Sequence, residues 1–163
     1  MSSLKIPHLP DADNDPLLDT RAMKLSAGTP RNKWMHVLLA DRQPKVRFAL
    51  RVLLERQPGV VVVGEAVNAD DLISQTRAKR PDLILLDWDL PGLMPSGSLS
   101  FLRNICPEIS VIALSGRAEA RQGALGAGAD AFASKVDPPE RLLATIRECT
   151  RRRFQKMDRA SQI

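Results

Sequence analysis

Five short apolar segments between residues 36 and 134 constrain the fold more than any other feature of the sequence. They are HVLLA at 36–40, VVVVGEA at 60–66, DLILLD at 82–87, SVIAL at 110–114 and AFAS at 131–134. Apolar runs of this length, without polar alternation, are typical of strands that are buried on both faces of a sheet. We therefore predict five strands, all of them inside a layered fold.

Segments with helical periodicity separate these strands. After the first strand, apolar residues recur at the spacing of one helix face, namely at Val46, Ala49, Leu50, Leu53 and Leu54. Asn68 is placed to cap the next helix, and Pro81 closes it. Further helices are predicted around Leu99–Ile105, over 117–125 and from Pro138 onward. Strands that alternate with helices through short connections indicate an α/β fold with a parallel sheet and helices on both faces.

Charge and proline content divide the chain into three parts. Residues 1–33 contain four of the twelve prolines and no sustained periodicity, so we expect a disordered or weakly ordered arm. Residues 34–150 form the predicted folded domain. Residues 151–163 are expected to be a basic tail, because the region 147–163 holds six Lys or Arg and two acids. The net charge of +5 therefore comes mainly from the end of the chain, since residues 36–146 hold thirteen bases and thirteen acids.

Two classes of protein are not expected. No uncharged apolar run reaches the roughly 20 residues that a membrane-spanning helix needs, and the N-terminal residues lack the apolar stretch of a signal peptide. Cys106 and Cys149 have no metal-type spacing and no histidine nearby, which favours neutral thiols in a reducing compartment. We therefore expect a cytoplasmic protein that does not contact a membrane.

Polar residues follow four of the five strands directly. Asp41 and Arg42 follow the first strand, Asp87 ends the third, Ser115 follows the fourth, and Lys135 follows the fifth. In open parallel sheets the working site lies beyond the carboxyl ends of the strands, so these side chains are expected to share one edge. A carboxylate can accept a phosphoryl group as a nucleophile, and an ammonium and a hydroxyl can hold its oxygens. This set is therefore suited to phosphoryl chemistry.

The order and spacing of four segments resemble the receiver domains of two-component response regulators, especially those of the helix-turn-helix (LuxR/FixJ-type) branch. The segments are VLLADRQPKVRFALRVLLE, PDLILLDWDLPG, VIALSG and GADAFASKVDPPERLLATIR, which together span about residues 36–150. The resemblance implies a flavodoxin-like (βα)5 fold, a doubly wound parallel sheet with strand order 2-1-3-4-5. It also implies a phosphoprotein of a phosphorelay rather than an enzyme.

The resemblance also implies a role for each matching residue. Asp87 corresponds to the phospho-acceptor, Lys135 to the lysine that contacts the phosphoryl group, and Ser115 to the hydroxyl that binds it and moves on activation. Phe132 stands at the aromatic switch position. Asp41, Asp87 and the backbone carbonyl of Asp89 correspond to the ligands of a Mg²⁺ ion.

Arg42 departs from the family pattern, because a second acid usually follows the first one at this place. The change removes an oxygen ligand and a negative charge from a site for a hard cation, so Mg²⁺ binding is in doubt. Arg42 could instead pair with Asp87 and hold the site in one state without metal. Asp41 could equally serve only as the salt-bridge partner of Lys135.

Three functions are therefore compared. The leading hypothesis is a stand-alone receiver that takes a phosphoryl group from a sensor histidine kinase or a phosphotransfer protein. The alternative is a degenerate receiver that binds a partner, or a second copy, without phosphorylation. A phosphatase of the haloacid-dehalogenase type is the weakest hypothesis: DWDLP resembles its nucleophile motif, but that motif follows the first strand there.

The expected partners are a kinase or phosphotransfer protein, a downstream protein and a second copy of the chain. Specific DNA binding is not expected, because the 13 residues after residue 150 are too few for a helix-turn-helix unit. A basic tail can touch nucleic acid through weak, salt-sensitive contacts. A solvated helix end is the simpler interpretation, and the sequence favours it.

Overall fold

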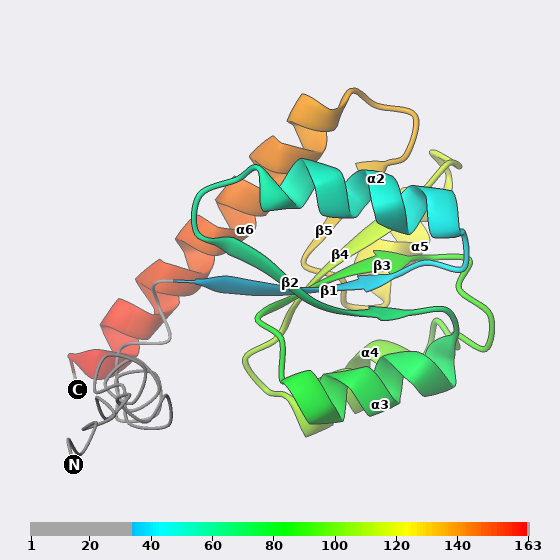
Figure 1. Cartoon of the computed structure of the whole chain (residues 1–163). Helices are drawn as coiled ribbons and strands as arrows, with labels where there is room; N and C mark the ends of the chain where they lie inside the picture. Colours follow the sequence, from blue (N-terminus) through cyan, green and yellow to red (C-terminus); the bar gives the residue numbers. More distant parts are fainter. Residues whose placement is uncertain (1–33, 163) are drawn as a thin grey trace, which may run out of the picture. The chain divides into compact units, whose positions relative to one another are not determined.

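A parallel sheet of five strands lies at the centre of residues 34–162, the part of the chain that the computed structural model describes (Figure 1). The strands are β1 (Met35–Ala40), β2 (Val60–Ala66), β3 (Leu83–Asp87), β4 (Ser110–Ser115) and β5 (Ala131–Ser134). The helices are α2 (Pro44–Glu55), α3 (Ala69–Lys79), α4 (Ser98–Ile105), α5 (Ala120–Gly126) and α6 (Pro139–Ser161). The arm expected over residues 1–33 lies outside the described residues, as does Ile163.

The strands are hydrogen-bonded in the order β2-β1-β3-β4-β5, and every neighbouring pair is parallel. This confirms the predicted fold class and strand order. The chain leaves β1 to form β2 on one side and then crosses to β3 on the other side, so the order reverses beside β1. A switch of this kind opens a crevice at the carboxyl ends of the central strands, where ligands bind in this class of sheet.

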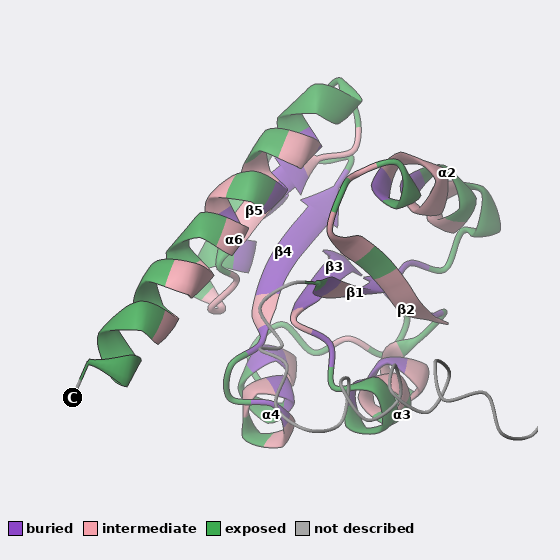
Figure 2. Cartoon of the chain, turned by 60° about the vertical axis from the view of Figure 1, so that its left-hand side comes forward, coloured by how far each residue is buried: buried purple, intermediate pink, exposed green. Residues whose placement is uncertain are grey.

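Alternate residues of the central strands enter two separate apolar cores. In β1, Val37 and Leu39 face the core that includes buried residues of α2 and α6, whereas Leu38 and Ala40 face the core that includes residues of α3 and α4. All four are at most 1% exposed. Figure 2 shows the result, with β1, β3 and β4 mostly buried, the edge strand β2 only partly buried, and the outer sides of the helices exposed. Burial on both faces explains why these strands read as unbroken apolar runs.

Helix α3 has a side-chain cap at its N-terminus and a left-handed residue at its C-terminus. The Asn68 side chain accepts a hydrogen bond from the backbone N–H of Asp71 at 2.8 Å, as an N-cap residue should. The helix ends at Arg80, which adopts a left-handed conformation with φ of 45°, immediately before Pro81. The N-cap at Asn68 and the end of the helix before Pro81 therefore both lie where the sequence predicted them.

Helix α6 is longer than expected. The segment from residue 151 onward, expected as a tail, continues the same helix to Ser161. Arg153 attaches this extension to the start of the sheet: it donates hydrogen bonds to the carboxylate of Asp82 at 3.0 Å and to the carbonyl oxygens of Asp82 and Glu108. Because Arg153 and Asp82 are both largely buried, this contact fixes the position of the helix beyond the apolar stripe.

Helix α5 begins later than predicted. A helix was expected from residue 117, but residues 117–119 form a turn and the helix starts at Ala120. The reason lies in Arg117, whose backbone N–H is held by the side chain of Ser115.

Among residues 34–162, no helix is long and apolar enough to cross a membrane.

Candidate functional site

Four polar residues that the sequence singled out lie at the carboxyl-terminal edge of the sheet. Asp41 directly follows β1, Asp87 ends β3, Ser115 ends β4, and Lys135 directly follows β5. Asp41, Asp87 and Ser115 are each at most 3% exposed. Polar side chains that are buried at one edge require hydrogen-bond or ionic partners, and here the partners are Lys135 and nearby backbone N–H groups.

The Lys135 ammonium joins the two acids. Its Nζ lies 2.6 Å from Oδ2 of Asp41 and 3.3 Å from Oδ1 of Asp87. The side chain of Lys135 is 23% exposed, so the ion pairs are well shielded from water. Two carboxylates and one ammonium leave one net negative charge in the cluster. Asp87 and Lys135 therefore share one pocket, and Asp41 does form the salt bridge considered from the sequence.

Backbone N–H groups also hold one oxygen of each acid. Oδ1 of Asp41 accepts a hydrogen bond from Gln43 at 2.8 Å, and Oδ1 of Asp87, the oxygen that contacts Lys135, accepts one from Asp89 at 3.0 Å. Within residues 34–162, Oδ2 of Asp87 accepts no hydrogen bond. The two oxygens of Asp87 therefore differ in their hydrogen bonding.

Ser115 lies on the neighbouring strand. Its backbone carbonyl accepts a hydrogen bond from the backbone N–H of Lys135 at 2.9 Å, which fixes the start of the loop that carries the lysine. Its Oγ accepts a hydrogen bond from the backbone of Arg117 at 3.1 Å. Phe132 lies three residues before Lys135 on β5 and is half-buried. The switch roles of Ser115 and Phe132 stay predictions.

Arg42 does not pair with Asp87. It is exposed, and among the described residues its side chain makes no hydrogen bond and no ion pair within 4.0 Å. Lys135 pairs with both acids instead, because it reaches the pocket from the end of β5. The expectation of an Arg42–Asp87 contact is therefore wrong for this conformation.

Two arginines near the site were not predicted. Arg117 Nη2 lies 2.6 Å from Oδ1 of Asp89, so this ion pair lies beside Asp87 and Ser115. Arg47 donates from Nη1 to the backbone carbonyl of Asp41 at 2.7 Å, while its buried Nε has no hydrogen-bond partner among residues 34–162. Arg117 stands two residues after a strand end, as Asp89 does, and that repeated spacing is the signal that could have identified the pair.

The donor set does not fit a divalent cation. Mg²⁺ prefers six oxygen ligands in octahedral geometry, and receiver domains typically bind it at this acidic pocket. Here the ammonium of Lys135 lies between the carboxylates that would hold the ion, and Arg42 replaces an acid. No group of three acidic, histidine or cysteine side chains within residues 34–162 is arranged to hold a metal. The pocket in this arrangement therefore does not offer Mg²⁺ the oxygen ligands that the ion prefers.

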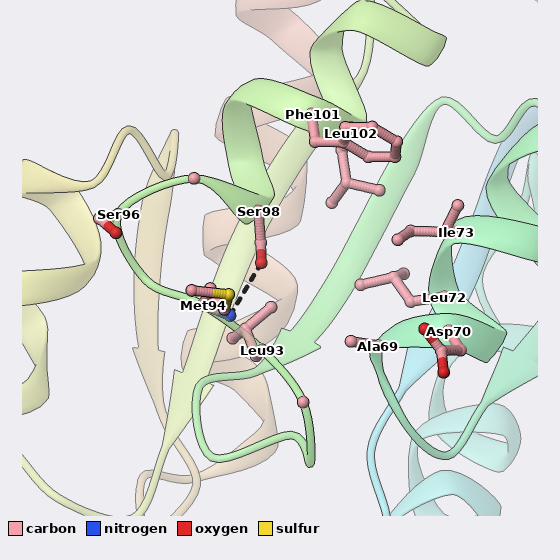
Figure 3. Close-up of a pocket in the computed structure, with 12 residues that line it drawn as sticks. Ala69, Asp70, Leu72, Ile73, Leu93, Met94, Ser96, Ser98, Phe101 and Leu102 are labelled. Carbon is pink, nitrogen blue, oxygen red and sulfur yellow. Dashed lines mark hydrogen bonds between the residues drawn. The ribbon is translucent and has the colours of Figure 1, made fainter.

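The loop after Asp87 borders an apolar hollow between α3 and α4 (Figure 3). Its volume is about 280 Å³, and Leu93, Met94 and Phe101 are among the side chains that line it. The Ser98 hydroxyl accepts a hydrogen bond from the backbone of Met94 at 2.9 Å, which ties the loop to the start of α4. Within the loop, Leu90 is buried and Leu93 is half-buried, whereas residues 94–97 are exposed.

A five-stranded doubly wound sheet with acids and a lysine at its crevice defines the receiver class of signalling domains, and comparison with known proteins agrees. The model of the response regulator receiver domain family matches residues 37–147, and the chain belongs to this family. The chain is therefore a two-component signalling domain rather than a classical enzyme.

Relatives include helix-turn-helix-type regulators. The nitrate/nitrite response regulator protein NarL of Escherichia coli K12 is 35% identical over 114 residues, which cover 69% of this chain and 53% of NarL. The transcriptional activator protein ExaE of Pseudomonas putida is 33% identical over 116 residues, which cover 69% of this chain and 54% of ExaE. This chain thus spans about half the length of the curated relatives that it matches.

Solved structures show the same architecture. A LuxR-family two-component response regulator from Aurantimonas sp. SI85-9A1 aligns with a TM-score of 0.65 and 28% identity, over 72% of this chain and 85% of that chain. The response regulator domain of Thermotoga maritima CheB aligns with a TM-score of 0.62 and 26% identity, over 72% of this chain and 97% of that chain.

Proposed function

We propose that Asp87 accepts a phosphoryl group from a phosphohistidine of a sensor histidine kinase or a phosphotransfer protein. The observation that carries this proposal is the asymmetry of the Asp87 carboxylate: Lys135 and the Asp89 backbone contact Oδ1, whereas Oδ2 accepts no hydrogen bond from residues 34–162. Proteins of this family interact with such donors. A carboxylate that is oriented through one oxygen, and whose other oxygen accepts no hydrogen bond, is suited to act as a nucleophile.

The transfer would form one bond and break one. Oδ2 of Asp87 attacks the phosphorus, the P–N bond of the phosphohistidine breaks, and the imidazole leaves with the electron pair and takes up a proton from solvent. The Lys135 ammonium stabilises the charge of the phosphoryl oxygens, and the Ser115 hydroxyl can donate to one of them once it rotates from the Arg117 backbone. The chain's own residues thus supply the nucleophile and the counter-charge.

The groove beside Lys135 supports docking of the donor protein. It lies along α2 and the start of α6, has a volume of about 620 Å³, and is lined in part by Phe48, Val52 and Leu142. The Phe48 side chain is 69% exposed. An exposed aromatic residue in a groove that Lys135 also lines is suited to anchor a partner that must approach the pocket of Asp87. A downstream partner, a homodimer through α2 and α6 and a cytoplasmic location stay predictions.

Intact-mass measurement tests phosphoryl acceptance. The full chain is incubated with acetyl phosphate, with Mg²⁺ in one arm and a chelator in the other, and Asp87→Asn serves as the control. We expect the mass gain of one phosphoryl group in both arms, because the donor set does not fit Mg²⁺, and no gain in the variant. Phe48→Asp should slow transfer from a phosphorylated histidine phosphotransfer domain but leave the reaction with acetyl phosphate unchanged.

A specific observation favours the alternative of a phosphorylation-independent binding module. Lys135 already pairs with both Asp41 and Asp87, so the ammonium that would contact a phosphoryl group is engaged by the acids themselves. No mass gain with either donor would support this alternative and refute the proposal. Steady hydrolysis of a generic phosphate ester, abolished by Asp87→Asn, would instead restore the phosphatase hypothesis.

A further inference from the structure

From Arg147 to Arg159, α6 carries five exposed cations, which are distributed over about half of the helix circumference. They are Arg147, Arg151, Arg152, Lys156 and Arg159, and we call them the basic face. Only two acids, Glu148 and Asp158, occur in the same stretch, so it has an excess of three positive charges even when the partly buried Arg153 is left out. With a rise of 1.5 Å per residue, the basic face is about 18 Å long.

The structure holds this face in position from both sides. On the inner side, Arg153 bonds to Asp82 at 3.0 Å and anchors the helix to the sheet. On the outer side, the carboxylate of Glu148 accepts hydrogen bonds from Arg151 at 2.7 Å and from Arg152 at 2.9 Å, which orders the two guanidinium groups next to each other. Ordered cations lose less conformational entropy when they bind an anion.

The composition of the face indicates which polyanion it fits. None of the exposed large apolar side chains among residues 34–162 belongs to α6, whereas a helix that binds a lipid surface inserts apolar side chains. Protein partners likewise need aromatic or apolar anchors at the centre of an interface. Four of the five cations are arginines, whose planar fork matches phosphate oxygens in pairs. Figure 2 shows this end of α6 exposed beyond the sheet.

We propose that the basic face binds the phosphate backbone of double-stranded nucleic acid without sequence preference. At 3.6 residues per turn, Arg147 and Arg151 lie about 40° apart around the helix axis, and Arg152 and Arg159 lie about 20° apart, so two pairs of arginines can each reach neighbouring phosphates. The face lies on the helix that leaves the sheet, away from the carboxyl-terminal edge that carries Asp87. The proposal therefore does not depend on phosphoryl acceptance.

Fluorescence anisotropy with the full chain and a labelled duplex of random sequence tests the proposal. The test variant combines Arg147→Gln, Lys156→Gln and Arg159→Gln, whose side chains make no hydrogen bond or ion pair within residues 34–162. The matched control combines Arg56→Gln, Lys79→Gln and Arg121→Gln, which removes the same charge from exposed positions elsewhere. Circular dichroism confirms that both variants remain folded.

For the wild type we expect weak binding, with Kd of about 10⁻⁶ to 10⁻⁴ M near physiological salt, and a steep loss of affinity as salt is added. Each phosphate contact contributes about −0.9 to the slope of log K against log salt, so the test variant should lose up to about 2.7 of that slope. Its affinity at 0.1 M salt should fall at least about tenfold, whereas the control should change less than about threefold.

Three results would overturn the proposal. They are equal affinity of the test and control variants, affinity that salt does not change, and binding to polyglutamate or to phosphatidylserine vesicles that is as strong as binding to the duplex. The Asp87→Asn variant should bind the duplex like the wild type, which separates failure of this proposal from failure of phosphoryl acceptance.

Discussion

Replacing Lys135 with methionine should destabilise the fold, and the structure indicates by how much. Asp41 and Asp87 both contact Nζ of Lys135, at 2.6 and 3.3 Å, so their contacting oxygens lie at most about 6 Å apart. Without the ammonium, two buried carboxylates repel each other by about 3 kcal/mol at an effective dielectric constant of 20. Removing one partner of a buried ion pair typically costs about 3–5 kcal/mol. We expect Lys135→Met to lower the free energy of unfolding by about 3 kcal/mol.

Urea denaturation at neutral pH measures this loss from the shift of the midpoint at constant slope. Lys156→Met is the matched control, because Lys156 is exposed and should change stability by less than about 0.5 kcal/mol. The double variant Lys135→Met with Asp41→Asn removes one of the two charges and should recover more than half of the loss. A loss below about 1 kcal/mol in the single variant, or no recovery in the double variant, would refute the reasoning.

Three further predictions concern single side chains. Asn68→Ala removes the cap that accepts from the Asp71 backbone and should cost about 1 kcal/mol, seen as a lower thermal midpoint. Gly92→Ala should cost about 1–2 kcal/mol in urea denaturation, because φ is +81° and the new Cβ would lie 3.2 Å from that of Ala69. Arg151 and then Arg152 lower the pKa of Glu148 to about 2 by hydrogen bonding. A lowered folded-state pKa gives stability that is present above about pH 4.5 and is lost as the pH falls towards 2. NMR signals of residues 148–152 should therefore titrate with a midpoint near 2, and Glu148→Gln should remove that titration.

Most of the fold follows from local sequence patterns. The stretches VVVVGEA and AFAS occupy the positions of β2 and β5 that the sequence predicted, because β-branched or small apolar residues bounded by turns leave few alternatives. The strand order needed more than periodicity. Alternation of strands and helices predicts parallel pairing, but the order 2-1-3-4-5 came from resemblance to a family.

The ends of helices were harder to predict, since tertiary contacts decide them. The extension of α6 depends on a contact between Arg153 and Asp82, which lie 71 residues apart in the sequence. Local propensity contains no information about such a partner. The delayed start of α5 has a similar origin, because the Ser115 side chain holds the Arg117 backbone in a turn.

The site was predicted as a set of positions, and its network of charges only in part, through the salt bridge between Asp41 and Lys135. That Asp87 and Lys135 share an edge follows from topology alone. Which cation neutralises the acids depends on side-chain direction: Lys135 points to them, and Arg42, although adjacent to Asp41 in the chain, is exposed. Adjacent residues after a strand commonly point to different sides, so sequence proximity was a poor guide to contact here.

The Arg153 anchor limits how the end of the chain can respond to events elsewhere in the molecule. The Asp82 carboxylate that holds Arg153 also accepts a hydrogen bond from the backbone of His36 at 2.9 Å, so one acid connects the last helix to two adjacent strands. A sliding of α6 along the sheet would have to break the hydrogen bonds of Arg153 to Asp82 and Glu108. A displacement of either strand that shifts Asp82 would therefore be transmitted to the C-terminal part of α6 through Arg153.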